Sequence, residues 1–405
     1  MPGTIRYMGT KRDQAEFLAK TISAEFPEAI VVDAFAGTCS IAKSLCPSHI
    51  VWANDIHHFA GIVARAALTD PLPKPDLEEA MAELRGPFTR NRDALVKQSA
   101  EALAIEQSAL VAATDASDWV PMSELIEGSA DLIPLRLEDY RGGRTPTPYA
   151  LFTIMYRHTY FGLRQCIELD SLRYAIACAP VRHRSFYMWA LFRAASHCAA
   201  APGHFAQYLT PRDATNTLLI VKYRNRGIWS RFVSEYSALT IPECHSRRKN
   251  AVFTEAASTF VSRLPSLLGG ARGVVYADPP YSRAQYSRYY HILETLALYD
   301  YPVIDHKGRY REGRFNTDFS RAGRVEHAIE DFISRAAAAS LPLFLSYPSN
   351  GLFVERGGDL MKVLRKYYSH VDCIGEHPME HSTLGGAPGT ASLPVTEILY
   401  FGEIQ

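Results

Sequence analysis

Apolar and polar residues alternate at the start of the chain in a pattern that predicts one α/β unit. Apolar side chains recur at helical spacing over Lys11–Phe26, and the short apolar run Ala29–Val32 predicts a strand that ends at Asp33. A glycine turn at Gly37 opens a second predicted helix, and His49–Ala53 predicts the next strand. This succession of strand, glycine turn, helix and strand is typical of the first half of a nucleotide-binding α/β fold.

The periodicity changes after Pro71 and returns near residue 250. The stretch Arg90–Ala113 is rich in alanine and predicts helix, and helical spacing recurs over Phe152–Tyr160 and Ser185–Ala199. Alternation of strands and helices then resumes. The predicted strands of this C-terminal part are Ala251–Phe253, Gly273–Ala277, Leu341–Tyr347, Tyr368–Ile374 and Val395–Phe401.

One α/β domain interrupted by an insert fits this order better than two successive domains. We predict that residues 1–70 and 250–405 form the α/β domain and that residues 71–249 form a mainly helical insert. No apolar stretch approaches the ~20 residues that a membrane helix needs, and the N-terminus lacks the apolar core of a signal peptide. We therefore expect a cytoplasmic protein.

The formal net charge is zero, yet charge is unevenly distributed along the insert. Residues 73–140 carry 6 Lys or Arg against 14 Asp or Glu, and residues 141–249 carry 16 against 5. The insert thus divides into an acidic part, 71–140, and a basic part, 141–249. A basic segment of this size suits the phosphate backbone of nucleic acid, and the alternative is a solvated, arginine-rich surface. The cations that we expect to contact nucleic acid are Arg182, Arg184, Arg224, Arg226, Arg247, Arg248 and Lys249.

The cysteine and histidine patterns argue against a disulfide framework and a metal site. The seven cysteines are an odd number and widely spread, with no Cys-x-x-Cys pair. The segment His377-Pro-Met-Glu380-His381 matches the H-x-x-E-H form of a zinc-peptidase motif. Pro378 would interrupt the helix on which such a motif lies, and loop composition follows it. We expect reduced, mostly buried thiols and no metal.

The tetrapeptide Asp278-Pro-Pro-Tyr281 directly follows the predicted strand Gly273–Ala277. Pro279 and Pro280 fix their own φ angles and make this loop stiff. The Asp278 carboxylate and the Pro279 carbonyl are then placed to accept the two N–H bonds of a planar amine, and the Tyr281 ring offers it a stacking face. The alternative is an ordinary turn after a strand, since Asp-Pro is common in turns.

A second candidate site lies in the N-terminal α/β unit. The segment Asp33-Ala-Phe35-Ala-Gly37 joins a strand to a helix, where backbone N–H groups and a helix N-terminus can face a ligand. Its single glycine is too few for a dinucleotide or P-loop signature. Asp55 lies 22 residues beyond Asp33, at the end of the next strand, from which a carboxylate can accept from both ribose hydroxyls of an adenosine. A helix N-cap is the competing interpretation of Asp55.

These segments resemble the alpha-group, Dam-like adenine-N6 DNA methyltransferases. The resemblance rests on three motifs that follow one another in that group's order, namely Tyr7-Met-Gly-Thr-Lys11, Asp33-Ala-Phe-Ala-Gly37 and Asp278-Pro-Pro-Tyr281. The segments Tyr156–Asp170, with Tyr160-Phe-Gly-Leu-Arg164, and Tyr286–Glu294 are also similar to segments of restriction-system members. The acidic stretch 76–140 is not covered by the resemblance.

The resemblance implies a Rossmann-like sheet that binds S-adenosylmethionine, with the insert as the target-recognition region for double-stranded DNA. By motif position, Tyr7, Lys11, Asp55 and Asp278 would line the cofactor and catalytic pocket, and the glycine turn would pass near the methionine part. Many relatives have a second glycine at the position that Cys39 occupies here. This departure bears on the cofactor contacts of residues 38–40.

The reaction that the resemblance implies is methyl transfer to the N6 atom of an adenine flipped out of the duplex. Aspartate rather than serine at position 278 favours adenine over the alternative, cytosine-N4 methylation. A non-catalytic DNA-binding relative of the fold is a second alternative. A prokaryotic or phage-encoded protein with a cognate restriction endonuclease acting on the same site is the implied setting, and the oligomeric state stays open.

Overall fold

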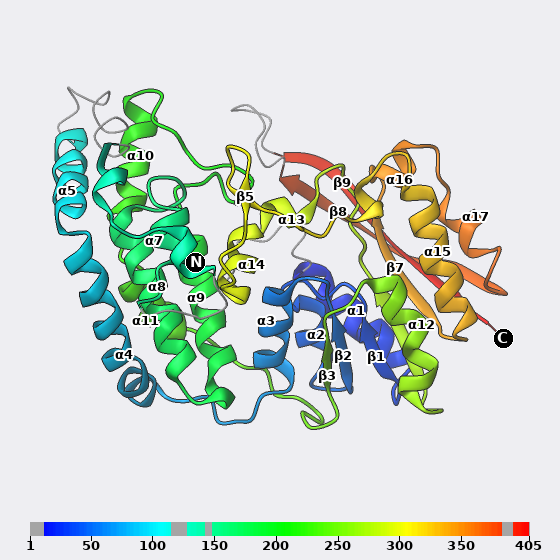
Figure 1. Cartoon of the computed structure of the whole chain (residues 1–405). Helices are drawn as coiled ribbons and strands as arrows, with labels where there is room; N and C mark the ends of the chain where they lie inside the picture. Colours follow the sequence, from blue (N-terminus) through cyan, green and yellow to red (C-terminus); the bar gives the residue numbers. More distant parts are fainter. Residues whose placement is uncertain (1–11, 115–127, 142–147, 383–391, 405) are drawn as a thin grey trace. The chain divides into compact units, whose positions relative to one another are not determined.

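The computed structural model describes residues 12–114, 128–141, 148–382 and 392–404 (Figure 1). The chain divides into two compact units. The described parts of unit 1 fall within Pro71–Thr240 and Tyr289–Arg314, and those of unit 2 within Tyr7–Asp70, Ile241–Arg288 and Phe315–Gln405. No helix among the described residues is long and apolar enough to cross a membrane.

Unit 2 is built on a seven-stranded sheet of order β3-β2-β1-β4-β7-β9-β8. In that order the strands are Ala251–Phe253, Val51–Asn54, Ile30–Asp33, Gly273–Ala277, Leu343–Pro348, Ser392–Glu403 and His370–Ser382. Neighbours from β3 to β7 are parallel, and β9 runs antiparallel to both β7 and β8. This mostly parallel sheet confirms the predicted Rossmann-like α/β fold.

The strand order reverses between β1 and β4. From β1 the chain adds β2 and then β3 on one side, and it returns to place β4 on the other side of β1. Ligands of open α/β sheets bind beyond the carboxyl ends of the strands at such a switch point. Both candidate motifs lie there, because Asp33 ends β1 and Asp278 follows β4.

Helices cover the sheet of unit 2 and bury its apolar strands. All five residues of β4 are buried, as expected for a central parallel strand covered on both faces. Phe260 and Leu264 of α12 and Phe332 of α15 belong to one apolar core with Val32 and Val275 of the sheet. The helical elements of this unit include α1 (Arg12–Glu25), α2 (Ser40–Leu45), α3 (His58–Leu68), α12 (Ala257–Leu268), η4 (Asp318–Ser320), α15 (Val325–Ala338), α16 (Leu352–Glu355) and α17 (Leu360–Leu364); a further short helix, α13 (Tyr286–Tyr289), follows the tetrapeptide.

The described part of unit 1 is mainly helical. Its longer helices are α4 (Leu77–Gln98), α5 (Ala100–Thr114), α8 (Leu163–Cys178), α9 (Arg184–Cys198), α10 (Ala214–Arg224), α11 (Ile228–Ser237) and α14 (His291–Leu298). Short elements complete it, namely η1 (Ser129–Leu132), η2 (Leu137–Tyr140), α7 (Leu151–Met155), η3 (Val181–His183), β5 (Ile304–Asp305) and β6 (Tyr310–Arg311). The single helix predicted over residues 90–113 is in fact two helices that meet at Ser99.

Unit 1 also takes in Tyr289–Arg314, which the sequence pattern assigned to the α/β domain. Tyrosine side chains explain this. The Tyr299 hydroxyl donates to the buried Asp170 carboxylate at 2.6 Å and accepts from the N–H of Leu151 at 3.2 Å. Burial raises the pKa of Asp170 to about 7, although these hydrogen bonds oppose the rise. Hydrogen bonds of Tyr299 to α7 and α8 therefore join this segment to unit 1.

The acidic and basic parts of the insert pack together through a buried carboxylate. Glu106 of α5 is 3% exposed and accepts from the N–H groups of Leu163 and Arg164 at the start of α8, at 2.6 and 3.0 Å. Burial alone would raise the pKa of Glu106, but His158 and the Arg224 charge outweigh it and hold that pKa below its ordinary value. Part of the sequence's charge asymmetry is thus neutralised inside unit 1.

Two segments adopt a different secondary structure from the one that their sequence pattern predicts or resembles. The helix predicted over Phe152–Tyr160 ends at Met155, because the Arg157 guanidinium donates to the carbonyls of Thr153 and Ile154. His158 then takes a left-handed φ of 61°. The H-x-x-E-H segment lies in strand β8, paired with β9, so the helix that a zinc-peptidase motif requires is not formed there.

Candidate active site

The carboxyl ends of β1, β2, β3 and β4 surround a cavity of about 410 Å³ in unit 2. Such a volume suits a small molecule. The ends of the four strands and the segments that follow them contribute Ala34, Phe35, Asn54, Asp55, Ile56, His57, Glu255, Ala256, Asp278, Pro280, Gln285, Tyr286 and Ser287. Helix α12 contributes its first two residues, Ala257 and Ser258. The remaining wall is Phe315–Phe319 with His327, Ala328, Asp331 and Arg335 of α15. The structure thus brings Phe35, Asp55 and Asp278 together.

Three carboxyl groups meet at this end of the sheet, and Asp55 and Asp278 give it a negative charge. Asp55 and Asp278 line the cavity, whereas Asp33 is 1% exposed and lies beneath it. Burial is the main reason that the pKa of Asp33 rises to about 8, and the Asp278 and Asp55 charges add to the rise. The backbone N–H of Phe35 opposes it. A cationic ligand is favoured here because it relieves the repulsion among these groups.

Asp55 joins two of the loops. One carboxylate oxygen accepts from the N–H of Gly37 at 2.9 Å, and the other accepts from the His57 N–H at 2.8 Å and lies 3.0 Å from His57 Nδ1. A carboxylate offers about four acceptor positions, so about one is left for a ligand. The helix N-cap is His57 itself, because α3 begins at His58. Asp55 therefore precedes the cap and shapes the loop.

The glycine turn keeps its backbone shape where its sequence departs from the resemblance. Gly37 has a φ of 50°, and Cys39 has a φ of 59° and a ψ of 31°, both in the left-handed region. Glycine adopts that region readily, while other residues pay about 1–2 kcal/mol. Cys39 is fully buried, and burial raises the pKa of its thiol. Cys39, which stands where many relatives have the second glycine, thus has the backbone conformation that glycine adopts most readily.

In the tetrapeptide, Asp278 and Pro280 line the cavity, but Pro279 and Tyr281 do not. Tyr281 is 9% exposed, and its ring belongs to the apolar core of unit 2. Its carbonyl accepts from the N–H of Leu352 at 2.7 Å. In this conformation the predicted stacking face is therefore largely covered by the core.

Sequence reasoning missed the part of the cavity wall that residues 315–319 form. The Gln285 amide donates to the Thr317 carbonyl at 3.0 Å and accepts from the Thr317 N–H at 2.9 Å. This pair of bonds holds Phe319 beside Phe35, with ring centroids 5.5 Å apart and an interplanar angle of 88°. Only the proximity of Gln285 to the tetrapeptide signals its role, and nothing in the local sequence marks the segment at Thr317.

The other predicted residues have varied positions. Tyr7 and Lys11 lie outside the described residues. Arg224 is 5% exposed and donates to the carbonyl of His158 at 3.0 Å, so it is not available to a phosphate at the surface. Arg247 donates to three carbonyls at the end of α3, those of Ala66, Ala67 and Asp70. The assignment of Arg224 as a DNA contact is therefore wrong, and Arg247 has a structural role.

The remaining predicted cations differ in exposure. Arg182, Arg248 and Lys249 are exposed, whereas Arg184 and Arg226 are half-buried. Arg184 donates to the carbonyl of Ala179 at 2.8 Å, and the Arg226 guanidinium stacks on the Tyr223 ring at 4.4 Å. Contact of these five cations with DNA stays a prediction. They belong to both units, because Arg248 and Lys249 fall within unit 2.

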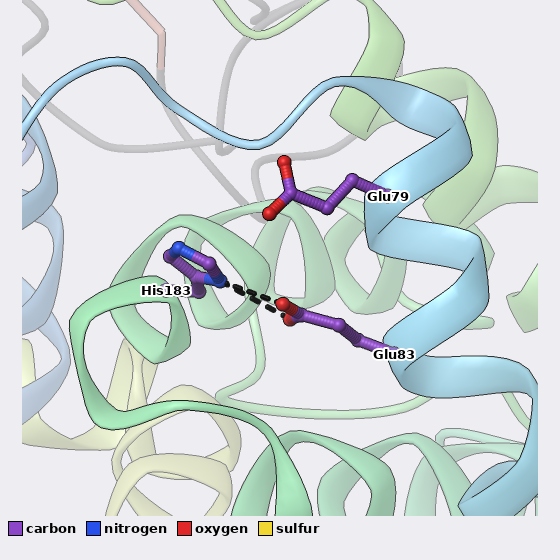
Figure 2. Close-up of side chains that lie close together, drawn as sticks. All are labelled: Glu79, Glu83 and His183. Atoms are coloured by element: carbon purple, nitrogen blue, oxygen red, sulfur yellow. Dashed lines mark hydrogen bonds and ion pairs between the residues drawn. The ribbon is translucent and has the colours of Figure 1, made fainter.

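One cluster in unit 1, Glu79, Glu83 and His183, has the residue types of a metal site, and Figure 2 shows its carboxylates beside the imidazole. His183 Nδ1 lies 2.9 Å from Glu83, and Nε2 accepts from Arg182 Nε at 3.0 Å. Metal-bound histidines instead donate their second N–H to an acceptor. With Nε2 accepting, the proton lies on Nδ1, the nitrogen that faces Glu83. The cluster therefore links α4 to η3 as a hydrogen-bonded pair, which Tyr187 extends by donating to Glu83 at 2.7 Å.

Short stretches of the chain are similar to curated methyltransferases. The type II methyltransferase M.FokI of Planomicrobium okeanokoites is 32% identical over 107 residues, which are 26% of this chain and 15% of that protein. The modification methylase StsI of Streptococcus sanguinis is 26% identical over 121 residues, 30% of this chain and 17% of that protein. The modification methylase LlaI of Lactococcus lactis subsp. lactis is 38% identical over 58 residues, which are 14% of this chain and 9% of that protein. The matches thus span less than a fifth of each relative. No family model matches the chain.

Proposed function

We propose that the chain is a site-specific DNA methyltransferase that transfers a methyl group from S-adenosylmethionine to the N6 atom of adenine. One observation carries the proposal: Asp55 and Asp278, from the two separate candidate sites of the sequence, line one cavity at the switch point of a Rossmann-like sheet. The partial similarity to proteins named as methyltransferases and modification methylases supports the same reaction.

The residues of the cavity fit this cofactor. S-adenosylmethionine supplies an electrophilic methyl group on a positively charged sulfonium. The Asp55 and Asp278 charges favour a cation, the Phe35 and Phe319 rings line the cavity where an adenine ring could pack, and Asp55 retains acceptor capacity for a ribose hydroxyl. Tyr7 and Lys11 would complete the pocket by motif position.

The tetrapeptide would prepare the amine for attack. The adenine amino group is a poor nucleophile, because its lone pair is delocalised into the ring. The Asp278 carboxylate and the Pro279 carbonyl would accept its two N–H bonds and favour a pyramidal nitrogen. The same acceptors would stabilise the positive charge that develops on that nitrogen, and the proton would leave late. Stacking on Tyr281 requires its ring to be more exposed than the 9% seen here.

We further propose that unit 1 reads the target sequence and that exposed arginines and lysines contact the DNA backbone. The basic part of the insert supports this, even though Arg224 is buried. A restriction endonuclease that acts on the same site would be the natural partner. Long-read methylation mapping of DNA from cells that express the chain would identify the base and the target sequence together.

The chemical test uses the purified full chain, S-adenosylmethionine and DNA of varied sequence, followed by mass spectrometry of the nucleosides. N6-methyladenine is the expected product. N4-methylcytosine would support the alternative base, and the absence of any methylated nucleoside would support a non-catalytic DNA-binding protein. Asp278→Asn should lower the transfer rate by about 10²-fold or more, as loss of an electrostatic contact to a developing charge does elsewhere. Glu28→Gln, a neutralised exposed carboxylate of unit 2, is the control.

A further inference from the structure

Two cysteines of unit 2 meet where the chain enters β3. Cys46 caps the C-terminus of α2 and is fully buried, while Cys244 precedes β3 and is half-buried. The two side chains are close enough for each thiol to shift the pKa of the other, that of Cys46 upward and that of Cys244 downward. The N–H of His245 donates to the Cys46 carbonyl at 2.6 Å, and Cys46 Sγ lies 3.4 Å from the Glu243 carbonyl. The two backbones are therefore joined on both sides of Cys244.

One fixed cation lies beside the Cys244 sulfur. Arg247 Nη1 lies 3.3 Å from it, and the carbonyls of Ala67 and Pro242 lie 3.9 and 3.8 Å away. Arg247 cannot easily turn away, because its guanidinium also donates to three carbonyls at the end of α3. The neighbouring Cys46 thiol is the main cause that lowers the pKa of Cys244, and Arg247 adds to the effect although burial opposes it. A lowered pKa increases the share of the thiolate, which is the nucleophilic form.

We propose that Cys244 is an oxidation site for hydroperoxides and that Cys46 resolves the oxidised residue to a Cys46–Cys244 disulfide. The Cys244 thiolate attacks one peroxide oxygen, so that an S–O bond forms, the O–O bond breaks and the leaving oxygen takes a proton as water or an alcohol. The Cys46 sulfur then attacks the Cys244 sulfenic acid. The S–S bond forms, the S–O bond breaks, and the hydroxide leaves with the Cys46 proton as water.

The position of this pair separates it from methyl transfer. Helix α2 leaves the carboxyl end of β1 and returns toward the amino end of β2, so Cys46 lies at the edge of the sheet opposite the cavity. The disulfide would fasten the end of α2 to the segment before β3. The inference therefore stands on the two thiols alone and does not depend on the proposed function.

The chain's tryptic map suits a direct test. Cleavage after Lys43 separates Cys39 from Cys46. Cys46 then lies on the peptide Ser44–Arg65 and Cys244 on the peptide Phe232–Arg247, and each peptide contains a single cysteine. The reduced full chain is treated with hydrogen peroxide, unreacted thiols are blocked with N-ethylmaleimide after denaturation, and the digest is analysed by mass spectrometry. A cross-linked pair of these peptides that dithiothreitol separates is the expected result.

Three outcomes would overturn the proposal: Cys244 remains a blocked thiol, Cys244 is oxidised without joining Cys46, or it joins a different cysteine. The exposed residues Cys178 and Cys373 report general oxidation in the same sample. Cys46→Ser, which keeps a hydrogen-bond donor beside Cys244 but cannot form the disulfide, should leave Cys244 as a sulfenic acid that dimedone traps. Arg247→Gln should slow the oxidation by at least about threefold, whereas Arg248→Gln should not change it. Equal rates in the two variants would remove Arg247 from the mechanism.

Discussion

Asp55 accepts a hydrogen bond from the backbone N–H of Gly37 at 2.9 Å, and this contact ties the loop after β2 to the turn after β1. The two loops approach the cavity from neighbouring parallel strands. A ligand that enters therefore meets a carboxylate and a glycine turn whose relative positions are already fixed, which lowers the entropy lost on binding.

Replacement of Asp55 should uncouple these loops. Asp55→Ala removes the acceptors of the Gly37 and His57 N–H groups, and we expect S-adenosylmethionine affinity to fall by about 10- to 100-fold, the effect of about 1–3 kcal/mol per lost charged contact. Isothermal titration calorimetry measures it. Asp55→Asn, which keeps one acceptor oxygen, should lose less. Unchanged affinity in Asp55→Ala would contradict the assignment of this carboxylate to the cofactor.

The left-handed backbone at Cys39 should make the glycine variant more stable than the alanine variant, the reverse of the order expected in a helix. With a φ of 59°, Cys39→Gly should be more stable than Cys39→Ala by about 1 kcal/mol, because only glycine adopts this region without strain. Cys166 of α8 is the matched control, since in a helix alanine should be the more stable by a similar amount. Denaturant unfolding of the four variants gives both differences. The same order at both sites would show that the strain at Cys39 is negligible.

A methyl group at Gly162 should disrupt the cap of α8. A Cβ there would lie 2.7 Å from Glu106 Oε1 and push the carboxylate away from the Leu163 and Arg164 N–H groups. We expect Gly162→Ala to lower the free energy of unfolding by about 2 kcal/mol or more. Gly86→Ala should instead raise it by about 0.5–1 kcal/mol, because an added Cβ on Gly86 of α4 meets only an ordinary contact at 3.7 Å. A neutral Gly162→Ala would show that Glu106 can move without loss.

The raised pKa of Asp33 predicts a pH dependence of stability. Because this pKa is about 8 in the folded chain, folding takes up a proton between an ordinary carboxyl pKa near 4 and pH 8. Stability contributed by the protonated group is thus complete at low pH and declines as pH rises through that window. Asp33→Asn, which cannot ionise, should gain stability relative to the wild type steadily from pH 5 to pH 8. Urea unfolding at four pH values checks it, and parallel curves would refute it.

Two adjacent arginines should behave differently toward DNA. Arg248 is exposed, so Arg248→Gln should weaken binding and reduce the slope of log K against log salt by about 0.9 if it contacts one phosphate. Arg247 is held by the end of α3, so Arg247→Gln should lower stability and leave that slope unchanged. Fluorescence anisotropy with a labelled duplex at several salt concentrations measures both. Equal slopes in the wild type and Arg248→Gln would remove Arg248 from the DNA surface.

The parts of the fold predicted best from the sequence have local signals. The predicted bounds of β3 and β4 match the structure, because short apolar runs there end at polar or turn-forming residues. The strand predicted over Tyr368–Ile374 extends instead to Ser382 as β8, since its pairing with β9 continues beyond the apolar run. Pairing between distant segments leaves little trace in either sequence.

The cavity residues also divide into those with a local sequence signal and those placed by tertiary packing. Asp55 and Asp278 are recognisable because each follows the end of a strand directly. Phe319 and Arg335 reach the cavity through tertiary packing, so no local pattern predicts them. The burial of Arg224 is equally hidden, since its partner Glu106 belongs to another helix of the unit.

The bonds between Gln285 and Thr317 have a consequence for how the cavity can diversify. The Gln285 side chain bonds only to the backbone N–H and carbonyl of Thr317, so these two hydrogen bonds do not depend on neighbouring side chains. Phe315 and Asn316, which line the cavity, are exposed and make no part of this attachment. Substitution of these two side chains, in evolution or by design, should therefore leave the backbone of the wall in place and change only the surface that a ligand contacts.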